Sequence, residues 1–268
     1  MQGLRQVSSL QNDTIKLIRS LEMRKARRET GLFLAEGAGV LDVARAQGWV
    51  PKILLVGRGA IEVAHTRALV EWALAKGAEC LDVPDQLLAK VSERDNPQTL
   101  VCALEQRWTE APEPSREPAE TWLALESARY PRNVGTIMRT AAAVGVRVIV
   151  LVGESCDPFA IEAVRASVGA IFRVPLARMS QDDFLALMRR WPGESIGTHV
   201  ATDTDYRRAY QGPALVVMGT EQSGLSAPVA QACSRLVKIP MVGGVDSLNL
   251  ATAAALVLYE TRRPYIAI

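Results

Sequence analysis

The sequence predicts an α/β protein built from two domains. Short apolar, valine-rich runs alternate with longer segments of helical periodicity along the whole chain. A proline-rich stretch divides this alternation into two parts, and 268 residues are enough for two domains of ordinary size. We expect a first domain at residues 1–106, a linker at 107–120 and a second domain at 121–268.

Composition narrows the class of protein. Apolar residues make up 49% and charged residues 22% of the chain, as in soluble globular proteins. No apolar run is long enough to span a membrane, and the first residues lack the apolar core of a signal peptide. The cysteines show no paired spacing, so we expect reduced thiols, no metal site and a cytoplasmic protein. They are Cys80, Cys102, Cys156 and Cys233, and the two histidines are His65 and His199.

Residues 13–30 are predicted to form one helix with a basic face. Arg24, Arg27 and Arg28 fall at spacings i, i+3 and i+4, so they share one side of such a helix. Neutralising phosphates is the main source of sequence-independent RNA affinity, which makes this face a candidate RNA contact. A merely solvated face is the alternative, and the lack of aromatic residues argues against base stacking there. The candidate RNA-binding residues are Lys16, Arg19, Arg24, Lys25, Arg27 and Arg28.

The rest of the first domain alternates strands and helices, which predicts a small α/β sandwich. Glu36, at the end of the first of these strands, is predicted to be solvated rather than to bind RNA. The predicted strands are 31–36, 52–56, 80–83 and 99–104, and the predicted helices are 37–47, 65–76 and 84–91.

In residues 107–120, three prolines alternate with four acids, which predicts a semi-rigid linker. Beyond it, Asn133 is positioned to cap a helix that carries Arg139 six residues later. Ser180 is expected to cap a further amphipathic helix. The predicted strands of this domain are 122–126, 147–152, 172–175 and 195–201, and the predicted helices after Asn133 are 162–167 and 180–191.

The stretch from residue 214 to 260 carries two strand-to-loop turns. A buried strand at 214–218 is followed by a glycine-bracketed loop at 219–224, where a missing Cβ lets backbone approach closely. A second strand at 236–239 ends at Pro240, and a loop at 241–247 leads into a helix from Leu248. Both loops are expected at the carboxyl edge of one sheet, where open α/β sheets bind ligands.

Three ordered motifs lie in this domain, made of the runs Asn133 to Thr140 (NVGTIMRT), Gly219 to Leu225 (GTEQSGL), Ile239 to Met241 (IPM), Ser247 to Asn249 (SLN) and the closing Tyr259–Glu260. They resemble those of the SpoU (TrmH-type) RNA 2′-O-ribose methyltransferases, the ribose-methylating branch of the SPOUT superfamily. One departure is Thr220, where that family usually has asparagine. The run RETGLFLAEG from Arg28 to Gly37 resembles the amino-terminal substrate-binding domain of ribosomal-RNA members, which is similar to a ribosomal protein.

The resemblance implies a carboxyl-terminal α/β domain with a deep trefoil knot that binds S-adenosylmethionine. It makes Arg139 the catalytic residue, but a guanidinium stays protonated in proteins, so we expect Arg139 to bind a phosphate and stabilise the developing alkoxide. Asn133, Glu221, Ser247 and Asn249 complete the implied catalytic set, although Asn133 and Ser247 have plain helix caps as the alternative. The implied cofactor-binding residues are Thr198, Val200, Ala201, Gly219, Glu221, Gly224, Ile239, Met241, Ser247 and Leu248.

The expected function is therefore methyl transfer to a ribose 2′-hydroxyl, in ribosomal RNA, by a homodimer formed through the carboxyl-terminal domain. A tRNA 2′-O-methyltransferase and a non-catalytic RNA-binding protein of the same fold are the alternatives. A nicotinamide dehydrogenase ranks below them because no G-x-G-x-x-G with a following acid is present. The target nucleotide cannot be read from these motifs.

Overall fold

The computed structural model describes residues 2–92, 98–244 and 247–266, and the chain divides into two compact units. The first unit contains residues 1–106 and also 157–172, and the second contains 107–156 and 173–268. Residues 157–172 therefore pack with the first unit, although they lie within the range 121–268 that we expected to form the second domain. The chain passes between the units at three places.

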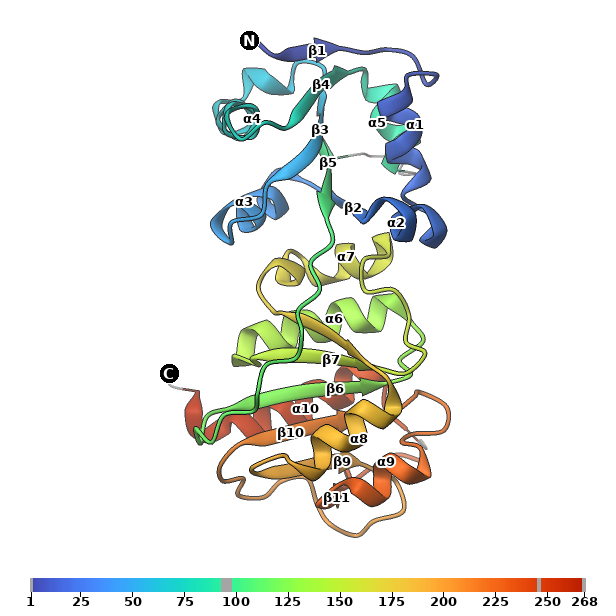
Figure 1. Ribbon diagram of the computed structural model, residues 1–268, viewed down its shortest axis with the longest axis vertical. Helices are drawn as coiled ribbons and strands as arrows, with labels where there is room; N and C mark the ends of the chain where they lie inside the picture. Colours follow the sequence, from blue (N-terminus) through green and yellow to red (C-terminus); the bar gives the residue numbers. More distant parts are fainter. Residues whose placement is uncertain (1, 93–97, 245–246, 267–268) are drawn as a thin grey trace. The chain divides into compact units, whose positions relative to one another are not determined.

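The first unit is built on a five-stranded mixed sheet in the order β1-β4-β3-β5-β2 (Figure 1). β5 runs antiparallel to both of its neighbours, and the other pairs are parallel. The short edge strand β1 was not predicted from the sequence. The strands are β1 Leu4–Gln6, β2 Leu32–Glu36, β3 Pro51–Gly57, β4 Glu79–Val83 and β5 Leu100–Glu105. The helices are α1 Asp13–Ser20, α2 Arg24–Thr30, α3 Ala38–Ala46, α4 Ala64–Ala75, α5 Asp85–Ser92 and α7 Ile161–Ser167, with 3-10 turns η1 Ala60–Glu62 and η2 Ala170–Phe172.

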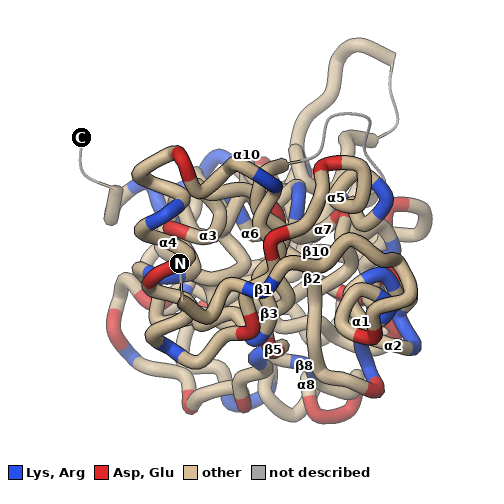
Figure 2. Tube along the Cα trace, turned by 90° about the horizontal axis from the view of Figure 1, so that it is seen from above, with Lys and Arg blue, Asp and Glu red and all other residues tan. Residues whose placement is uncertain are grey.

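The single helix predicted over 13–30 is wrong, because the chain breaks between α1 and α2. Leu21 is the C-cap residue of α1 and is buried, and Met23 has extended backbone before α2 begins. The guanidinium of Arg27 donates to the carbonyl oxygens of Leu21 and Glu22, at 2.8 and 2.6 Å. These bonds satisfy carbonyls that the end of α1 leaves without helical partners. Figure 2 shows the Lys and Arg positions of α1 and α2 in blue.

Arg27 is therefore a structural residue and leaves the candidate RNA face. It is only 4% exposed, and its Nε lies 2.7 Å from a carboxylate oxygen of Asp157. The other residues of that face are exposed. Lys16 and Lys25 form ion pairs within their own helices, at 3.5 and 3.8 Å, and these are solvated pairs of small net energy.

The segment 157–172 contributes both aromatic and charged contacts to the first unit. The Phe159 ring lies 4.9 Å from that of Phe33, and the Phe172 ring lies 5.2 Å from that of Trp49. Arg165 donates to both carboxylate oxygens of Glu36, at 3.0 and 2.9 Å. The prediction that Glu36 is solvated is thus wrong, because its side chain is nearly enclosed by this pair.

The second unit is built on a six-stranded parallel sheet in the order β11-β9-β10-β6-β7-β8. Side chains alternate along its central strands, so that Trp122 and Ala124 pack with α8 and α9 on one face, while α6 and α10 cover the other (Figure 1). The strands are β6 Thr121–Glu126, β7 Val148–Val152, β8 Leu176–Met179, β9 Glu194–Thr198, β10 Ala214–Met218 and β11 Arg235–Val237. The helices are α6 Pro131–Val144, α8 Gln181–Arg189, α9 Ala227–Ala232 and α10 Leu250–Arg262, followed by the 3-10 turn η3 Arg263–Tyr265.

Two predicted strands of this unit are corrected. The strand expected at 172–175 begins only at Leu176, because Pro175 has no N–H for the sheet and Phe172 packs in the first unit. The strand expected at 195–201 ends at Thr198. Residues 107–120 lack regular structure, as predicted for a linker, but the Thr109 N–H donates to the carbonyl of Leu176 at 2.8 Å and attaches this segment to the second unit. No helix within the described residues is long and apolar enough to cross a membrane.

Candidate functional site

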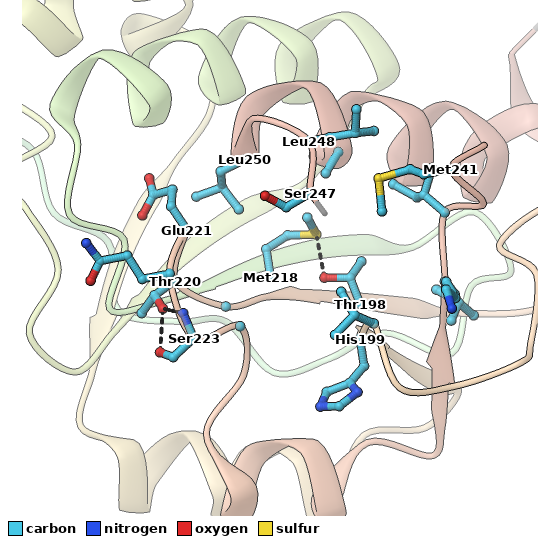
Figure 3. Close-up of a pocket in the computed structure, with 18 residues that line it drawn as sticks. Thr198, His199, Met218, Thr220, Glu221, Ser223, Met241, Ser247, Leu248 and Leu250 are labelled. Carbon is cyan, nitrogen blue, oxygen red and sulfur yellow. Dashed lines mark hydrogen bonds between the residues drawn. The ribbon is translucent and has the colours of Figure 1, made fainter. Parts of the chain in front are cut away.

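A cavity of about 370 Å³ lies at the carboxyl edge of the parallel sheet, where β9, β10 and β11 end (Figure 3). Its size falls within the range of small-molecule sites in proteins. The loops that follow Thr198, Met218 and Val237 form its walls, together with the start of α10. The two loops singled out in the sequence therefore do meet at one sheet edge.

The loop after β10 closes tightly on itself. Thr220 and Gly224 exchange two backbone hydrogen bonds, of 2.9 and 3.1 Å, and the Thr220 hydroxyl accepts the Ser223 N–H at 3.0 Å (Figure 3). A Cβ on Gly219 would lie 2.0 Å from the Gly224 carbonyl carbon, and Gly224 itself has φ +68°. The loop's own backbone therefore requires both glycines, and the threonine side chain fastens the turn.

A chain of side-chain hydrogen bonds joins the three sequence motifs. Asn133 donates its amide to Glu221 Oε1 at 2.9 Å and accepts from the amide of Asn249 at 3.0 Å. Glu221 lines the cavity, and Asn249 lies between the lining residues Leu248 and Leu250. The second oxygen of Glu221, Oε2, is buried and has no hydrogen-bond partner among the described residues. It is thus an open acceptor next to the cavity.

Both alternative cap assignments are wrong. Tyr130 is the N-cap of α6, without a side-chain cap bond, and Asn133 lies in the first turn of the helix. Its amide is therefore free to connect the other two motifs. The N-cap of α10 is Asn249, whose Oδ1 accepts from the N–H groups of Ala251 and Thr252, whereas Ser247 lines the cavity.

Arg139 stands apart from this chain. It lies on an exposed position of α6 and is not among the residues that line the cavity. It makes no hydrogen bond or ion pair with any residue that the structure describes. The Glu221 carboxylate accepts from Asn133 and makes no bond to Arg139 among the described residues. The guanidinium is consequently available to a ligand.

The residues that line the cavity can be compared with the cofactor-binding set that the resemblance implies. Every member of that set lines the cavity except Ala201, which is exposed beyond it. The lining residues outside that set are His199, Met218, Thr220, Gln222, Ser223, Val237, Lys238, Leu250 and Ala253. Met218 and Val237 are the last residues of their strands. The rule that ligands bind beyond the carboxyl ends of strands could therefore have identified them from the sequence.

The chemistry of the wall suits a molecule that is part apolar and part polar. Met218, Met241, Leu248 and Leu250 supply thioether and aliphatic surface (Figure 3). The buried Glu221 Oε2 offers an acceptor for an N–H or O–H group. S-adenosylmethionine carries an aliphatic chain with an ammonium group and an adenosine with hydroxyls, so these residues fit it. The described residues contain no cluster of three metal-ligating side chains.

Comparison with known proteins gives similarity along nearly the whole chain. Residues 120–259 match the SpoU rRNA Methylase family, and residues 12–102 match the MRM3-like substrate binding domain. An uncharacterized tRNA/rRNA methyltransferase from Synechocystis is 32% identical, covering 96% of this chain and 93% of that protein. The 23S rRNA (guanosine(2553)-2′-O)-methyltransferase RlmP of Bacillus subtilis is 25% identical, covering 97% of this chain and 100% of its own.

A solved structure extends this similarity to the fold. The AdoMet-bound rRNA methyltransferase from Sinorhizobium meliloti is 36% identical and superposes with a TM-score of 0.90. The match covers 99% of this chain and 100% of that one. The similarity therefore includes both units.

Proposed function

The chain belongs to the SpoU rRNA methylase family, and from this membership we propose that it methylates a ribose 2′-hydroxyl of ribosomal RNA with S-adenosylmethionine as donor. The observation that carries the proposal is the hydrogen-bond chain Glu221–Asn133–Asn249, which brings the three family motifs together beside the cavity. Relatives named as 2′-O-methyltransferases of 23S rRNA and an AdoMet-bound relative support the reaction class and the donor.

The cavity residues hold the donor in this proposal. Met218, Met241 and Leu248 cover its apolar parts, and Glu221 Oε2 accepts from one of its polar groups or from the ribose. When bound, S-adenosylmethionine supplies a methyl group on a positively charged sulfur, which an oxygen nucleophile attacks. Ser247, on the cavity wall, is available to contact the donor or the target nucleotide.

Arg139 acts on the RNA. Its unpaired guanidinium binds the phosphate beside the target ribose and stabilises negative charge on the 2′-oxygen as the proton leaves. Asn133 and Asn249 hold the first turn of α6 at a fixed position relative to the cavity. The ribose 2′-hydroxyl bound near α6 is thereby oriented toward the methyl donor. A group other than the guanidinium, which is always charged, accepts the proton of the 2′-hydroxyl.

The remaining expectations belong to the same proposal. The carboxyl-terminal chain forms the deep trefoil knot of the superfamily, and the first unit binds RNA with a fold similar to a ribosomal protein. The enzyme works in the cytoplasm as a homodimer through its second unit. The exposed RNA-contact residues of the first unit are Lys16, Arg19, Arg24, Lys25 and Arg28.

The test is transfer of labelled methyl from S-adenosylmethionine to ribosomal RNA and tRNA from cells that lack this gene. A methylated 2′-hydroxyl cannot attack the neighbouring phosphodiester, so the label is expected in alkali-stable dinucleotides of ribosomal RNA. Arg139→Ala is expected to abolish transfer and still bind the donor. Label in tRNA would select the alternative substrate, and donor binding without any label would favour the non-catalytic RNA-binding protein.

A further inference from the structure

The outer face of α6 carries one continuous exposed stripe. Arg132, Thr136 and Arg139 follow one another at spacings of four and three residues, and all are exposed, whereas Val134 and Ile137 are buried against the sheet. Arg132 and Arg139 are seven positions apart, which is about two turns or roughly 10 Å along the helix axis. Arg132 therefore lies on the same face of α6 as Arg139, nearer the N-terminus of the helix.

The turn before α6 extends this stripe with a cation and an aromatic ring. Arg129 is exposed, and Tyr130 is 51% exposed although aromatic side chains are usually covered. The carbonyl of Tyr130 accepts from the N–H groups of Asn133 and Val134, at 3.0 and 3.2 Å. The backbone that presents the ring is thus fixed by the helix, while the ring itself makes no hydrogen bond and no aromatic or cation contact with a described residue.

The charge of this surface is uncompensated. Within the described residues, Arg129, Arg132 and Arg139 form no ion pair, in contrast to Arg147 and Arg207 of the same unit, which pair with carboxylates at 2.6 Å. The first turn of α6 contains no acid. Unpaired guanidiniums beside an exposed ring suit a polyanion with flat bases, because the cations bind phosphates and the ring offers a face for stacking.

The same surface is coupled to the cavity. Asn133, next to Arg132 in the chain, is bonded to Glu221 of the cavity wall and to Asn249 at the start of α10. The first turn of α6 therefore has a fixed position relative to the donor site. A nucleic-acid strand that presents its ribose to Arg139 has to continue past one end of this stripe.

We propose that Arg129, Tyr130 and Arg132 bind the single-stranded RNA that flanks the methylated nucleotide. The Tyr130 ring stacks on an unpaired neighbouring base, and the two guanidiniums bind phosphates of the same strand. The inference rests on the proposed function and adds to it the form of the substrate, namely a loop or bulge whose bases are unstacked.

The test compares Tyr130→Ala, Tyr130→Phe, Arg132→Gln and the control Arg189→Gln, an exposed arginine of α8, in the full-length enzyme. Loss of one stacked base is expected to raise the KM for RNA about tenfold in Tyr130→Ala. Tyr130→Phe, which keeps the ring, is expected to match the wild type, and the Kd for S-adenosylmethionine is expected within about twofold in all variants. Arg132→Gln is expected to lower the slope of log affinity against log salt by about 0.7, and Arg189→Gln to leave it unchanged.

Two results would overturn the inference. One is a KM for RNA in Tyr130→Ala within about twofold of wild type. The other is a change of oligomeric mass in that variant, which would assign the ring to a subunit contact. Wild-type methyl transfer in the same assay reports on the proposed function separately. If no RNA accepts methyl, filter binding of ribosomal RNA still decides whether Tyr130 and Arg132 contact it.

Discussion

Asn249 performs two separable tasks, and a single substitution distinguishes them. Its Oδ1 caps α10, and its amide nitrogen donates to Asn133. Asn249→Asp keeps the acceptor and removes the donor, so the thermal midpoint is expected to stay close to wild type. Loss of a bond in the chain to the Glu221 carboxylate is expected to lower kcat roughly tenfold or more. Thermal unfolding and steady-state methyl transfer measure the two effects.

The control for this prediction is Asn249→Ala, which removes both tasks. It is expected to cost about 1 kcal/mol of stability as well as the activity, because the first N–H groups of α10 lose their acceptor. If Asn249→Asp keeps full kcat, the hydrogen bond to Asn133 has no part in catalysis.

Two buried thiols, Cys80 and Cys102, and the half-buried thiol of Cys233 provide a pH-dependent prediction. Burial raises the pKa of Cys102 and of Cys233 to about 12 and that of Cys80 to about 11, because it disfavours the thiolate. All three are therefore neutral and poorly reactive at pH 8. Their neutral form favours the folded state fully below the ordinary thiol pKa of 9.0, and this contribution is lost as pH rises through 11 to 12.

Alkylation followed by peptide mass spectrometry checks this prediction. Native protein at pH 8 is expected to remain unlabelled at these three cysteines for hours, and protein unfolded in guanidinium is expected to be labelled at once. Rapid labelling of Cys102 in the native state would contradict its burial.

Arg27 shows why the role of a single residue could not always be predicted from the sequence. In sequence it cannot be distinguished from Arg24 and Arg28, which are exposed. Its partner Asp157 lies 130 positions away, in a segment that the periodicity assigned to the other domain. The cofactor-binding residues implied by the resemblance line the cavity except for Ala201, because most of their motifs follow strand ends.

Elements with one unambiguous pattern were predicted well. β10 has the predicted bounds, since a valine-rich run between proline and glycine leaves no alternative. The break between α1 and α2 was missed because residues 13–30 contain no glycine or proline before Gly31. The break depends instead on a tertiary contact, the burial of Leu21 beneath the Arg27 guanidinium.

Glu126 joins β6 to α8 and to the start of α9, beside the loop that begins at Gly219. This buried carboxylate at the end of β6 accepts from Gln181 of α8 at 3.0 Å and from the N–H and hydroxyl of Ser226, at 2.9 and 2.6 Å. Ser226 is the N-cap of α9 and directly follows the loop that begins at Gly219. Glu126→Gln places an amide donor among these donors, so we expect a loss of about 2 kcal/mol in stability and a roughly tenfold higher Kd for the donor.

Glu120→Gln is the matched control for this prediction. Glu120 is also buried, at the opposite end of β6, where it accepts from Trp122 at 2.7 Å and Arg147 at 2.6 Å. We expect a similar loss of stability and an unchanged Kd, measured by denaturation and calorimetry. Equal effects of both variants on Kd would mean that Glu126 acts through general stability alone.

For the molecule as a whole, the order of the two domains along the chain was predictable. The return of residues 157–172 to the first unit was not. The proline-rich boundary near residue 107 marks one of the three crossings between the units. The crossings at residues 157 and 173 carry no composition signal, because the intervening α7 has an ordinary helical pattern. Only the contacts made by Phe159 and Arg165 identify the unit to which it belongs.

Because residues 157–172 belong to the first unit, its stability is expected to depend on Asp157, which lies between the two chain segments of the second unit. Asp157 neutralises the buried Arg27 and also accepts the Phe159 N–H at 3.0 Å. Asp157→Asn keeps an oxygen for that N–H but leaves the guanidinium without a counter-charge. We expect a loss of about 3 kcal/mol, because removing one partner of a buried pair leaves an uncompensated charge. Chemical denaturation of the full chain, followed through the tryptophans of each unit, measures it.

Glu29→Ala is the control, since Glu29 pairs with Lys25 at 3.8 Å on the exposed side of the same helix. That pair is solvated, so its removal is expected to change stability by less than about 0.5 kcal/mol. Trp49 and Trp72 report on the first unit and Trp122 and Trp191 on the second, which assigns any shifted transition. A shift confined to the second unit would mean that residues 157–172 do not stabilise the first. A shift that includes the first would show that its fold requires chain supplied from beyond the linker.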